Sequence, residues 1–573
     1  MEASRMPVGI EFFERLRRSG CYYVDKSEMI MHAAGNGNMG VTLFTRPRRF
    51  GKTLTMSMLQ SFFDITRDSR DVFEGLAITK HEDFCKEWMN QYPVLFLSLK
   101  DVEGYDYKKA YGRLKGRIAN LCKEHSCLLQ SEKVDADDRA VFQKLKSETA
   151  DELQVEDSLL TLTRMLYAHY GKPAVVLIDE YDVSLSKAYD ANMQPDHYLK
   201  MLSTIRSFLG GALKTNPYLQ FAVLTGCMRI SKESIFTGVN NFKSYSILDS
   251  KFSDAFGFTQ EEVSRLLCAV GLSKKLTLVK SWYDGYIFGD SEIFCPWDVL
   301  NYVNDYVSLA EEGCEREPGN YWKNSSGNSI VDEFVKDERF DVSEKFETLM
   351  NGGCIEQAIT DQLTYEELKE EEDNFWSVLF MTGYLTKADK NERDGVIHLK
   401  IPNAEISSIF EDSIVRRFKK SIDRDVQREV MQALWEKDER KASRLLSELL
   451  WNTISYHDYH ENYYHAFVTG LVAGCGYEVD SNQENGLGRT DILIRDRKNR
   501  RAVIIEAKKA AKEGDLEKMC LEGKRQIIER KYIKGLKGYT QIICYGMSFF
   551  EKTAMARLLD MEEAETKEGS KRA

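Results

Sequence analysis

The chain has 573 residues, and its 79 Lys and Arg against 91 Asp and Glu give a formal net charge of −12. Hydrophobic residues make up 43% and charged residues 30%, which is typical of a globular protein and excludes a disordered or collagen-like chain. The acidic balance argues against a protein that coats nucleic acid by its bulk charge, and no apolar run reaches the ~18 residues that span a bilayer.

Four short apolar runs in the first half of the chain predict buried strands of a parallel sheet. They are rich in β-branched and aromatic residues, and segments with helical periodicity separate them, as in α/β folds. The runs are Val41–Phe44, Val94–Leu99, Ala174–Ile178 and Phe221–Leu224. The segment between the second and third runs, roughly residues 107–169, is too long for one crossover helix and predicts a helical insertion.

The patterns after these runs are mainly helical. Thr259 and Glu262 have the spacing of a capping box before an apolar-periodic segment, which predicts a helix and a small helical domain up to about residue 310. Residues 320–400 have a mixed pattern, and residues 404–455 predict helices with acidic and basic faces, as in a connector. From about Tyr456 the composition changes again.

The first chemical motif lies in residues 41–59, VTLFTRPRRFGKTLTMSML. An apolar strand leads through a polar turn to Gly51, Lys52 and Thr53, which open a helix. In this arrangement backbone N–H groups face an anion, the lysine reaches the β- and γ-phosphates, and the threonine ligates Mg²⁺. Arg46 occupies the first glycine position of the usual GxxxxGK[ST] pattern, and Pro47 removes one N–H donor. An ordinary lysine-bearing helix start therefore remains an alternative for this fragment alone.

Two later strands supply the rest of an ATP site. Residues 174–182, AVVLIDEYD, end an apolar run in Asp179 and Glu180, the positions at which P-loop NTPases hold Mg²⁺ and orient water. Residues 221–229, FAVLTGCMR, place Thr225 and Arg229 after another strand, where they could lie beside the γ-phosphate. For Arg229, a surface arginine in a loop is an equally good interpretation.

The chain resembles the bacterial and archaeal AAA-ATPase-like proteins that carry a PD-(D/E)XK nuclease domain at their C-terminus. The matching segments are 9–30, RPRRFGKT (46–53), LIDEYD (177–182), 224–242, WYDGYIFG (282–289), 295–303 and YWKNSSGN (321–328). The resemblance implies that RPRRFGK replaces the glycine-rich loop and that Arg46, Arg48 and Arg49 add positive charge to the phosphate site. The alternative for these arginines is that they are simply solvated. The resemblance also implies that Tyr23–Lys26 lies near the nucleotide.

The second chemical motif lies in residues 484–508, ENGLGRTDILIRDRKNRRAVIIEAK. Asp491 is expected to open one strand, and Arg501–Ala507 to form the next. Glu506 and Lys508 share a strand face because alternate side chains point the same way. Asp491 and Glu506 could hold Mg²⁺, and Lys508 could activate water or stabilise charge on phosphorus. An ExK triplet is common on solvated strands, but this one ends an apolar run, where unpaired charge is costly.

The flanking segments YYHAF (463–467), SNQENG (481–486) and RQIIERKY (525–532) resemble the same nuclease domain. By this resemblance Gln526, on a later helix, is expected to face the site as a further catalytic residue. Glu461 and Glu484 are weaker candidates for extra acidic groups. His465 is interpreted as an ordinary helix histidine rather than a catalytic base.

The charge is unevenly distributed along the chain. Residues 455–552 carry 17 Lys and Arg against 14 Asp and Glu, a net charge of +3, and the rest of the chain carries −15. Arginines and lysines cluster at residues 495–501 and again at 508–512. Such clusters contact phosphates in nucleic-acid-binding proteins, although an ordinary solvated hairpin explains them equally well.

The sequence thus predicts an α/β protein in five parts: a P-loop, AAA-ATPase-like parallel-sheet domain (1–250), a helical lid (251–320), a mixed and helical connector (321–455), a restriction-endonuclease-like PD-(D/E)XK domain (456–560) and a disordered tail (561–573). Twelve Cys without a CxxC pair predict reduced thiols in a cytoplasmic protein rather than a zinc site or a disulfide scaffold.

The predicted activity is ATP binding, with hydrolysis, coupled to Mg²⁺-dependent cleavage of nucleic acid, DNA in the first place. ATP and Mg²⁺ are the expected cofactors, no membrane partner is expected, and the nucleotide state could act through domain packing or a homo-oligomer. Two alternatives stay open: a nucleotide-gated switch with a weak or silent nuclease, and an ATPase scaffold whose last domain only recognises a partner.

Overall fold

The computed structural model describes residues 5–34, 40–189, 195–229, 236, 239, 242–310, 317–322, 343–361, 363, 367, 371–389, 396–421, 424–453, 461–473, 475, 477–485, 488–530, 532–536 and 538–559. The chain divides into two compact units, Met1–Ser326 with Glu356–Ile406, and Gly327–Ile355 with Ser407–Ala573. Among the described helices, none is both long enough and apolar enough to cross a membrane.

A five-stranded parallel sheet forms the centre of the first unit, with strand order β2-β3-β4-β1-β5. The strands are β1 (Val41–Thr45), β2 (Val94–Ser98), β3 (Ala174–Asp179), β4 (Leu219–Gly226) and β5 (Phe242–Tyr245). The four strands expected from apolar runs are confirmed. The edge strand β5 was not predicted, because its sequence FKSY is short and only half-buried.

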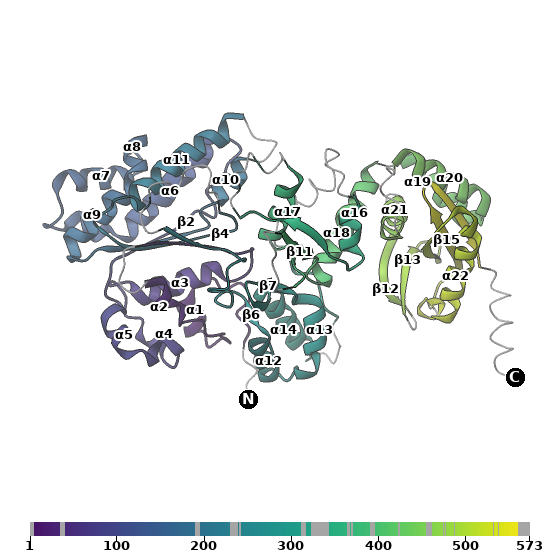
Figure 1. Cartoon of the computed structure of the whole chain (residues 1–573), viewed down its shortest axis with the longest axis horizontal. Coiled ribbons are helices and arrows are strands. Elements are labelled where there is room, and N and C mark those ends of the chain that lie inside the picture. The colour runs from purple at the N-terminus through teal and green to yellow at the C-terminus, as the bar shows by residue number, and fades with distance from the viewer. Residues whose placement is uncertain are drawn as a thin grey trace. The chain divides into compact units, whose positions relative to one another are not determined.

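Two helical layers cover this sheet (Figure 1). One contains α6 (Tyr107–Glu124), α7 (Ala136–Lys146), α8 (Glu152–Glu156), α9 (Ser158–Tyr170), α10 (Val183–Ala188) and α11 (Pro195–Leu213). The other contains α1 (Phe13–Arg18), α2 (Met29–Ala34), α3 (Lys52–Phe63), α4 (Arg70–Phe73) and α5 (Glu82–Trp88). The helical insertion expected over about residues 107–169 is therefore confirmed.

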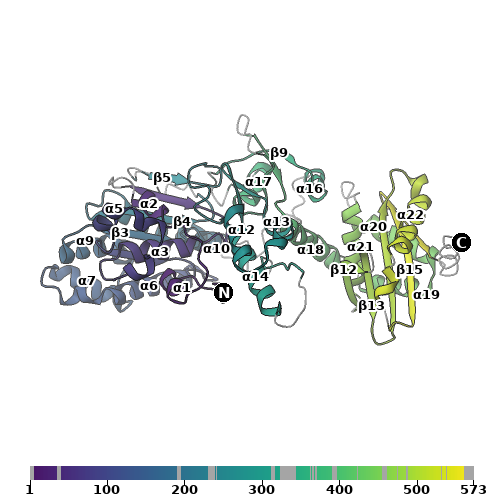
Figure 2. The same cartoon turned by 90° about the horizontal axis from the view of Figure 1, so that it is seen from below.

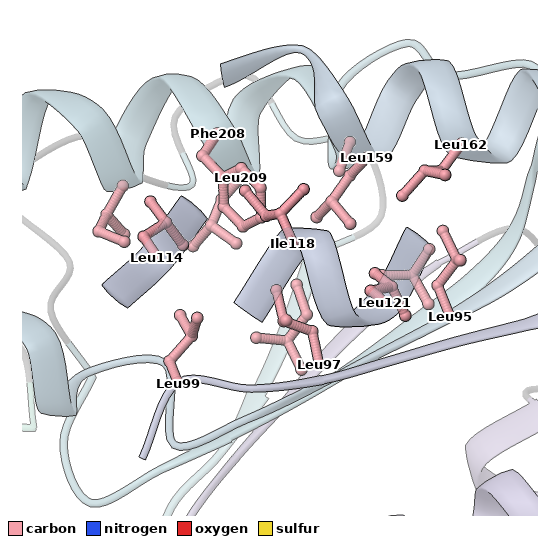
Figure 3. Close-up of a cluster of buried hydrophobic side chains, with 14 of the residues drawn as sticks. Leu95, Leu97, Leu99, Leu114, Ile118, Leu121, Leu159, Leu162, Phe208 and Leu209 are labelled. Atoms are coloured by element: carbon pink, nitrogen blue, oxygen red, sulfur yellow. The ribbon is translucent and has the colours of Figure 1, made fainter. Parts of the chain in front are cut away.

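Leucines of the first layer pack directly on the sheet (Figure 3). Leu95, Leu97 and Leu99 come from β2 and the turn after it, and Leu114, Ile118 and Leu121 from α6. Each of these six side chains is at most 3% exposed. Burial of such a side chain contributes roughly 1.5–3 kcal/mol, so this layer fixes the edge strand and the sheet on which the first candidate site stands.

The region predicted as a lid, residues 251–320, contains helices and a small sheet. It contains α12 (Gln260–Ala269), α13 (Leu276–Tyr283) and α14 (Pro296–Ala310), and a sheet of β6 (Phe258–Thr259), β8 (Ser291–Phe294) and β7 (Tyr286–Phe288) in that order. The expected capping box is present: the Thr259 hydroxyl accepts the Glu262 N–H at 3.3 Å, and the Glu262 carboxylate accepts the Thr259 N–H at 2.8 Å. This cap starts α12 at the predicted place.

The middle of the chain adds further elements. They are α16 (Ser343–Met350), α17 (Glu372–Met381), and a sheet with the order β10 (Thr386–Lys387), β11 (Val396–Lys400), β9 (Ile355–Ala358). The predicted helices over 404–455 follow as α18 (Ala404–Ser421), α19 (Arg424–Glu436) and α20 (Glu439–Thr453). The tail expected over 561–573 lies outside the described residues.

A second five-stranded sheet, ordered β12-β13-β14-β15-β16, forms the centre of the second unit (Figure 2). Its strands are β12 (Glu478–Asn485), β13 (Gly488–Asp496), β14 (Arg501–Lys509), β15 (Gln541–Phe550) and β16 (Thr553–Leu558). Only the β14–β15 pair is parallel. Helices α21 (Glu461–Ala473) and α22 (Leu516–Glu529) pack against these strands.

The expectation that Asp491 opens a strand is wrong, because β13 begins at Gly488. Backbone pairing with β12 extends the strand through a polar segment, with Thr490 opposite Gln483 and Gly488 opposite Asn485. These residues carry no apolar alternation, so the sequence gives no signal for this part of the strand. Asp491 therefore lies inside β13 rather than at its start.

Candidate active sites

The first candidate site starts at the turn between β1 and α3. Gly51 has φ of 84° and precedes α3, and Arg49 has φ of 73°. These left-handed conformations, which glycine adopts without a steric penalty, reverse the chain and leave the first N–H groups of α3 without intrahelical acceptors. Such N–H groups, at the positive end of the helix dipole, form an anion site.

Lys52 is the first residue of α3 and is only 5% exposed. Its ammonium group donates to the carbonyl oxygens of Arg46 (2.9 Å) and Pro47 (2.8 Å) and lies 3.9 Å from the Cys227 sulfur. The lysine is thus held over the turn, beside the end of β4. A cation in this position can bind a phosphate that enters the turn.

Three residues from separate motifs meet at the carboxyl ends of β1, β3 and β4. The Thr53 hydroxyl donates to Asp179 Oδ2 at 2.8 Å, and the Thr225 hydroxyl donates to Asp179 Oδ1 at 2.5 Å. Asp179 and Thr225 are fully buried. This edge is where parallel sheets bind ligands, so the arrangement brings together the threonine and aspartate that the sequence assigned to Mg²⁺.

Glu180 follows Asp179 with φ of 55° and is half-buried. Burial raises the pKa of its carboxyl group, and the charge of Lys52 acts in the opposite direction. Its backbone N–H lies 3.4 Å from the Thr225 hydroxyl. A non-glycine residue in the left-handed region is uncommon and stores strain, and here it follows directly the aspartate of the candidate site.

Sequence reasoning missed Tyr181 and Asp182, although they complete the LIDEYD motif. The buried Asp182 carboxylate accepts the backbone N–H groups of Cys227 (2.8 Å) and Met228 (3.0 Å), and the Tyr181 hydroxyl donates to the Met228 carbonyl at 2.8 Å. The two side chains therefore fix the turn after β4, which faces Lys52. The sequence signal that could have identified them is a tyrosine and an aspartate that follow the strand β3 almost directly.

Arg46 was expected among the nucleotide-binding residues, and the structure gives it a different environment. It is fully buried, and its guanidinium donates at 2.8–3.0 Å to the carbonyl oxygens of Thr45, Tyr245 and Phe252. Burial lowers the pKa of Arg46 to about 10. Its two terminal nitrogens donate to backbone carbonyls, and its buried Nε has no hydrogen-bond partner among the described residues, so Arg46 supports the turn.

Arg48 lies beside Cys227, and the charges of Cys227, Asp182 and Glu180 raise the pKa of Arg48 against the effect of its burial. Arg49 and Arg229 contact aromatic rings. The Arg49 guanidinium lies 4.2 Å from the centre of the Trp297 ring, a stacking distance that links the turn to the lid. Arg229 lies 5.8 Å from the Phe242 ring. No contact given for the described residues joins Arg49 or Arg229 to Asp179.

An apolar pocket opens beside Gly51. Its wall includes Leu54 and Met58 of α3, the segment Ala255–Phe258, and Tyr22–Val24 with Lys26. Lys26 forms an ion pair with Glu262 of the lid at 2.7 Å, and both side chains are less than one-fifth exposed. The segment that the resemblance implied to be near the nucleotide therefore lines a cavity that touches the phosphate turn.

The second candidate site lies on β13 and β14. The Lys508 ammonium is 3.2 Å from Glu506 Oε1 and 3.9 Å from Asp491 Oδ2, and the Ala507 N–H donates to Asp491 Oδ2 at 2.9 Å. Glu506 is fully buried, and its Oε2 has no hydrogen-bond partner among the residues that the structure describes. The structure thus brings together Asp491, Glu506 and Lys508 as the sequence predicted.

The Glu506 carboxyl has the properties of a metal ligand. Burial raises its pKa to about 7, the charge of Asp491 adds to this effect, and Lys508 opposes it. A buried oxygen without a donor is costly, and a divalent cation would relieve that cost. No cluster of three or more His, Cys, Asp or Glu side chains occurs in the described part of the chain, so other ligands would be water or phosphate, as Mg²⁺ usually requires.

Helix α22 brings Gln526 toward this site. A side chain at Gly546 would lie 2.1 Å from the Cys520 carbonyl, so only glycine lets α22 approach β15 this closely. Gln526 Nε2 lies 3.4 Å from the hydroxyl of Tyr532, which is 1% exposed. Burial raises the pKa of Tyr532, the bond from Gln526 lowers it, and the charges of Glu506 and Asp491 raise it further.

Tyr532 was not predicted, and its only signal was an aromatic residue six positions after Gln526. His465 lies with Nε2 2.8 Å from the Asp491 carbonyl oxygen, a backbone contact that agrees with its interpretation as a structural histidine. The side chains of Glu461 and Glu484 lie outside the described parts of α21 and β12.

Most arginines of the basic hairpin between β13 and β14 have local partners. Arg495 pairs with Asp480, Arg497 with Glu478 at 2.6 Å, and Arg501 with Asp496 at 2.8 Å. Arg501 also lies 4.2 Å above the Trp435 ring. These contacts favour the interpretation of an ordinary, internally paired hairpin over a dedicated phosphate surface.

Two family models match the chain. One, described as a predicted AAA-ATPase, matches residues 7–236, and the other, described as the PD-(D/E)XK nuclease superfamily, matches residues 459–557. The chain joins an AAA-ATPase-like domain to a PD-(D/E)XK nuclease-superfamily domain. This finding confirms the resemblance seen in the sequence, and the two sheets confirm the α/β fold class.

Individual relatives add little about activity. An uncharacterised protein encoded in the vnfD 5′ region of Azotobacter chroococcum mcd 1 is 24% identical over 422 residues, covering 73% of this chain and 71% of its own length. Among solved structures, the Walker-type ATPase PABY2304 of Pyrococcus abyssi is 13% identical and covers 69% of this chain and 97% of its own, with a TM-score of 0.36.

Proposed function

We propose that the first domain binds ATP with Mg²⁺ at the turn before α3 and hydrolyses it. Lys52 would bind the β- and γ-phosphates, the N–H groups that follow Gly51 would bind their oxygens, and Thr53 with Asp179 would hold Mg²⁺. Glu180 would orient the attacking water, with Thr225 keeping Asp179 in position. The observation that carries this proposal is the contact of Asp179 with both Thr53 and Thr225.

The apolar pocket beside Gly51 supports ATP rather than a bare phosphate as the ligand. Its walls are mainly aliphatic and aromatic and enclose about 90 Å³, so a nucleoside base would enter only if these walls moved apart. Because the pocket and the phosphate turn share Gly51, one molecule with a base and a phosphate chain could then occupy both. Arg46, Arg49 and Arg229 take supporting places in this proposal, away from the phosphate.

The ATP site is tested by thermal unfolding of the full-length protein with and without Mg²⁺–ATP. ATP at 100 times its Kd is expected to stabilise the domain by about 2.7 kcal/mol, and Lys52→Ala should abolish that shift. Lys108→Ala, an exposed lysine on α6, is the matched control and should keep it. An ATP shift that is unchanged in Lys52→Ala would refute the phosphate site.

We further propose that the second domain is a Mg²⁺-dependent nuclease that acts on DNA. Asp491 and Glu506 would hold the metal, which when bound supplies Lewis-acid stabilisation of the phosphoryl oxygens. Lys508 would orient water and stabilise developing negative charge, and Gln526 would position substrate or water. The unpartnered Oε2 of buried Glu506 is the observation that carries this proposal.

Cleavage is tested with Mg²⁺ or Mn²⁺ on plasmid, single-stranded DNA and RNA, comparing the wild-type protein with Asp491→Ala and with Glu522→Gln, an exposed carboxylate on α22. We expect the wild type and Glu522→Gln to cut and Asp491→Ala to be inactive. Cutting by Asp491→Ala at the wild-type rate would show that the metal site is assigned wrongly. An inactive wild type would favour the nucleotide-gated switch.

We also propose limits for the domains, a cellular location and a mode of assembly. The ATPase-like domain would span 1–250, the lid 251–320, the connector 321–455 and the nuclease domain 456–560. The protein would act in the cytoplasm, and ATP would control cleavage through domain packing or a homo-oligomer. Limited proteolysis with and without ATP tests these limits.

A further inference from the structure

A second cavity of about 590 Å³ lies at the β2 edge of the first sheet. Residues of α1, α3, β2 and α6 line it, and it shares none of them with the pocket beside Gly51. Its volume falls within the range of small-molecule sites. The proposed ATPase activity assigns no role to this cavity.

Two aromatic rings and two amides line this cavity. The Phe12 ring is 56% exposed and the Phe96 ring is partly exposed, and neither contacts another ring in the described part of the chain. Gln60 is 8% exposed, and within the same part its side-chain amide has no hydrogen bond to protein. Asn120 adds a second amide, whose oxygen already accepts a hydrogen bond from Lys123 at 3.1 Å. Free rings stack on bases, and amide groups pair with their polar edges.

Guanidinium groups supply positive charge at the same cavity. Arg15, Arg18 and Arg117 line it. Arg18 lies 3.4 Å from Asp71 and Arg117 pairs with Asp101, whereas Arg15 has no carboxylate within ion-pair distance among the described residues. An exposed, unpaired guanidinium is suited to bidentate binding of phosphate.

The two carboxylates that line the cavity both interact with Arg67. Glu14 is already paired with Arg67 at 2.7 Å. Burial raises the pKa of Glu124, and the nearby Arg67 opposes that effect. These two carboxylates therefore leave room for an anion to bind beside the arginines of the cavity.

We propose that this cavity binds a nucleoside phosphate, either a free nucleotide or one nucleotide of a single strand, at a site separate from the ATP site. Phe12 and Phe96 stack against the base, Gln60 and Asn120 bind its polar edge, and Arg15 binds the phosphate. The proposal does not depend on ATP binding at Lys52.

The cavity is also placed to affect the ATP site. Gln60 and Lys52 lie on the same helix, eight residues and therefore ~12 Å apart along its axis. Ser98, which lines the cavity, lies opposite Asp179 in the register of β2 and β3. A ligand in the cavity thus contacts α3, which carries Lys52 and Thr53, and β2, the strand paired with β3, so binding at the two sites is expected to be coupled reciprocally.

The test uses the full-length Lys52→Ala variant, which removes the phosphate lysine and leaves the cavity unchanged. Calorimetric titrations with AMP, GMP, CMP and UMP, and with a 5′-phosphorylated pentathymidylate, should show binding of at least one probe. Gln60→Leu and Arg15→Glu, added separately, should weaken it about tenfold or more. Lys108→Glu, an exposed charge reversal on α6 outside the cavity, should leave it unchanged.

Binding of a monophosphate identifies the source as a free nucleotide, and binding of the pentathymidylate alone identifies a strand; both support the proposal. Binding of no probe, or binding that both cavity variants leave unchanged, overturns it. If Gln60→Leu does not fold, Arg15→Glu decides, because Arg15 is exposed. Failure of wild-type protein to bind ATP would refute the ATP site without affecting this result.

Discussion

The two candidate sites each rest on a fully buried carboxylate, and they satisfy it in different ways. Asp179 accepts hydroxyl hydrogen bonds on both oxygens, from Thr53 and Thr225. Glu506 has one oxygen near Lys508 and one without a donor, and its pKa is raised to about 7. Hydroxyl donors thus satisfy both oxygens of Asp179. The unpartnered oxygen of Glu506 instead destabilises the folded protein until a cation binds to it.

This difference predicts different responses to metal and mutation. A carboxylate that is already hydrogen-bonded keeps its geometry between ligand-binding events, and removing a donor should destabilise the protein. Where a buried carboxylate has an unpaired oxygen, removing its charge should instead stabilise the folded protein. Substitutions at the two sites test that contrast, beginning with the one of largest expected effect.

Replacing the lysine of the second site should separate metal binding from cleavage. In Lys508→Met, cleavage is expected to fall roughly 10²–10³-fold, because a preorganised cation near the developing charge is lost. Mg²⁺ should still stabilise the protein, since both carboxylates remain. Nuclease rates and Mg²⁺-dependent melting measure the two effects, with Lys512→Met as the control. Loss of Mg²⁺ stabilisation together with activity would contradict the assigned role.

At the first site, Glu180→Gln should separate ATP binding from hydrolysis. The amide keeps the shape but cannot orient and polarise water as the carboxylate does, so turnover is expected to fall by roughly 10²-fold. The thermal shift with Mg²⁺–ATP should persist. Phosphate release and melting temperature provide the readouts. Full hydrolysis in this variant would remove Glu180 from the mechanism.

The Glu506 carboxyl predicts a pH dependence of stability in metal-free protein. Its folded pKa of about 7 lies above the ordinary 4.5, so the folded state holds the proton more tightly than the unfolded chain. The contribution of Glu506 to the free energy of unfolding is therefore largest below about pH 4.5 and is lost as the pH rises through about 7. Glu506→Gln should remove this loss and stabilise the protein at pH 8 by about 1–3 kcal/mol.

Urea unfolding in EDTA at pH 6 and pH 8, wild type beside Glu506→Gln, measures this effect. The difference between the two proteins should be larger at pH 8. A variant that is less stable than wild type at pH 8 would mean that the carboxylate is already satisfied.

Thr225→Val should have the opposite sign and a smaller size. It removes the hydroxyl that donates to Asp179 Oδ1 and leaves a buried carboxylate oxygen without that donor, so the metal-free protein should lose about 1–2 kcal/mol. Thermal unfolding measures the change, and Thr225→Ser, which keeps the donor, is the control. Equal stability of the valine and serine variants would show that the contact is unimportant.

Local patterns in the sequence predicted most of the framework on which these sites stand. The four apolar runs became the central strands, and Gly51–Thr53 and Asp179 were identified because their chemistry follows a strand directly. Asp491, Glu506 and Lys508 were found by spacing, and Gln526 by resemblance.

Long-range contacts could not be read from the sequence. Arg46 follows a strand in a basic segment, and only the fold shows that carbonyls from residues 245 and 252 surround it. Asp182 and Tyr532 act through groups on other elements, at Cys227 and at Gln526. The polar start of β13 depends on pairing with β12, and no local pattern encodes that pairing.

Calorimetric titration of Mg²⁺ into nucleotide-free protein at pH 8 tests the central contrast most directly. We expect wild type and Thr53→Ala to bind Mg²⁺ equally, because the unpaired oxygen of Glu506 attracts the metal without ATP, and we expect Glu506→Gln to lose that binding. Binding that survives in Glu506→Gln, or that disappears in Thr53→Ala, would contradict the account.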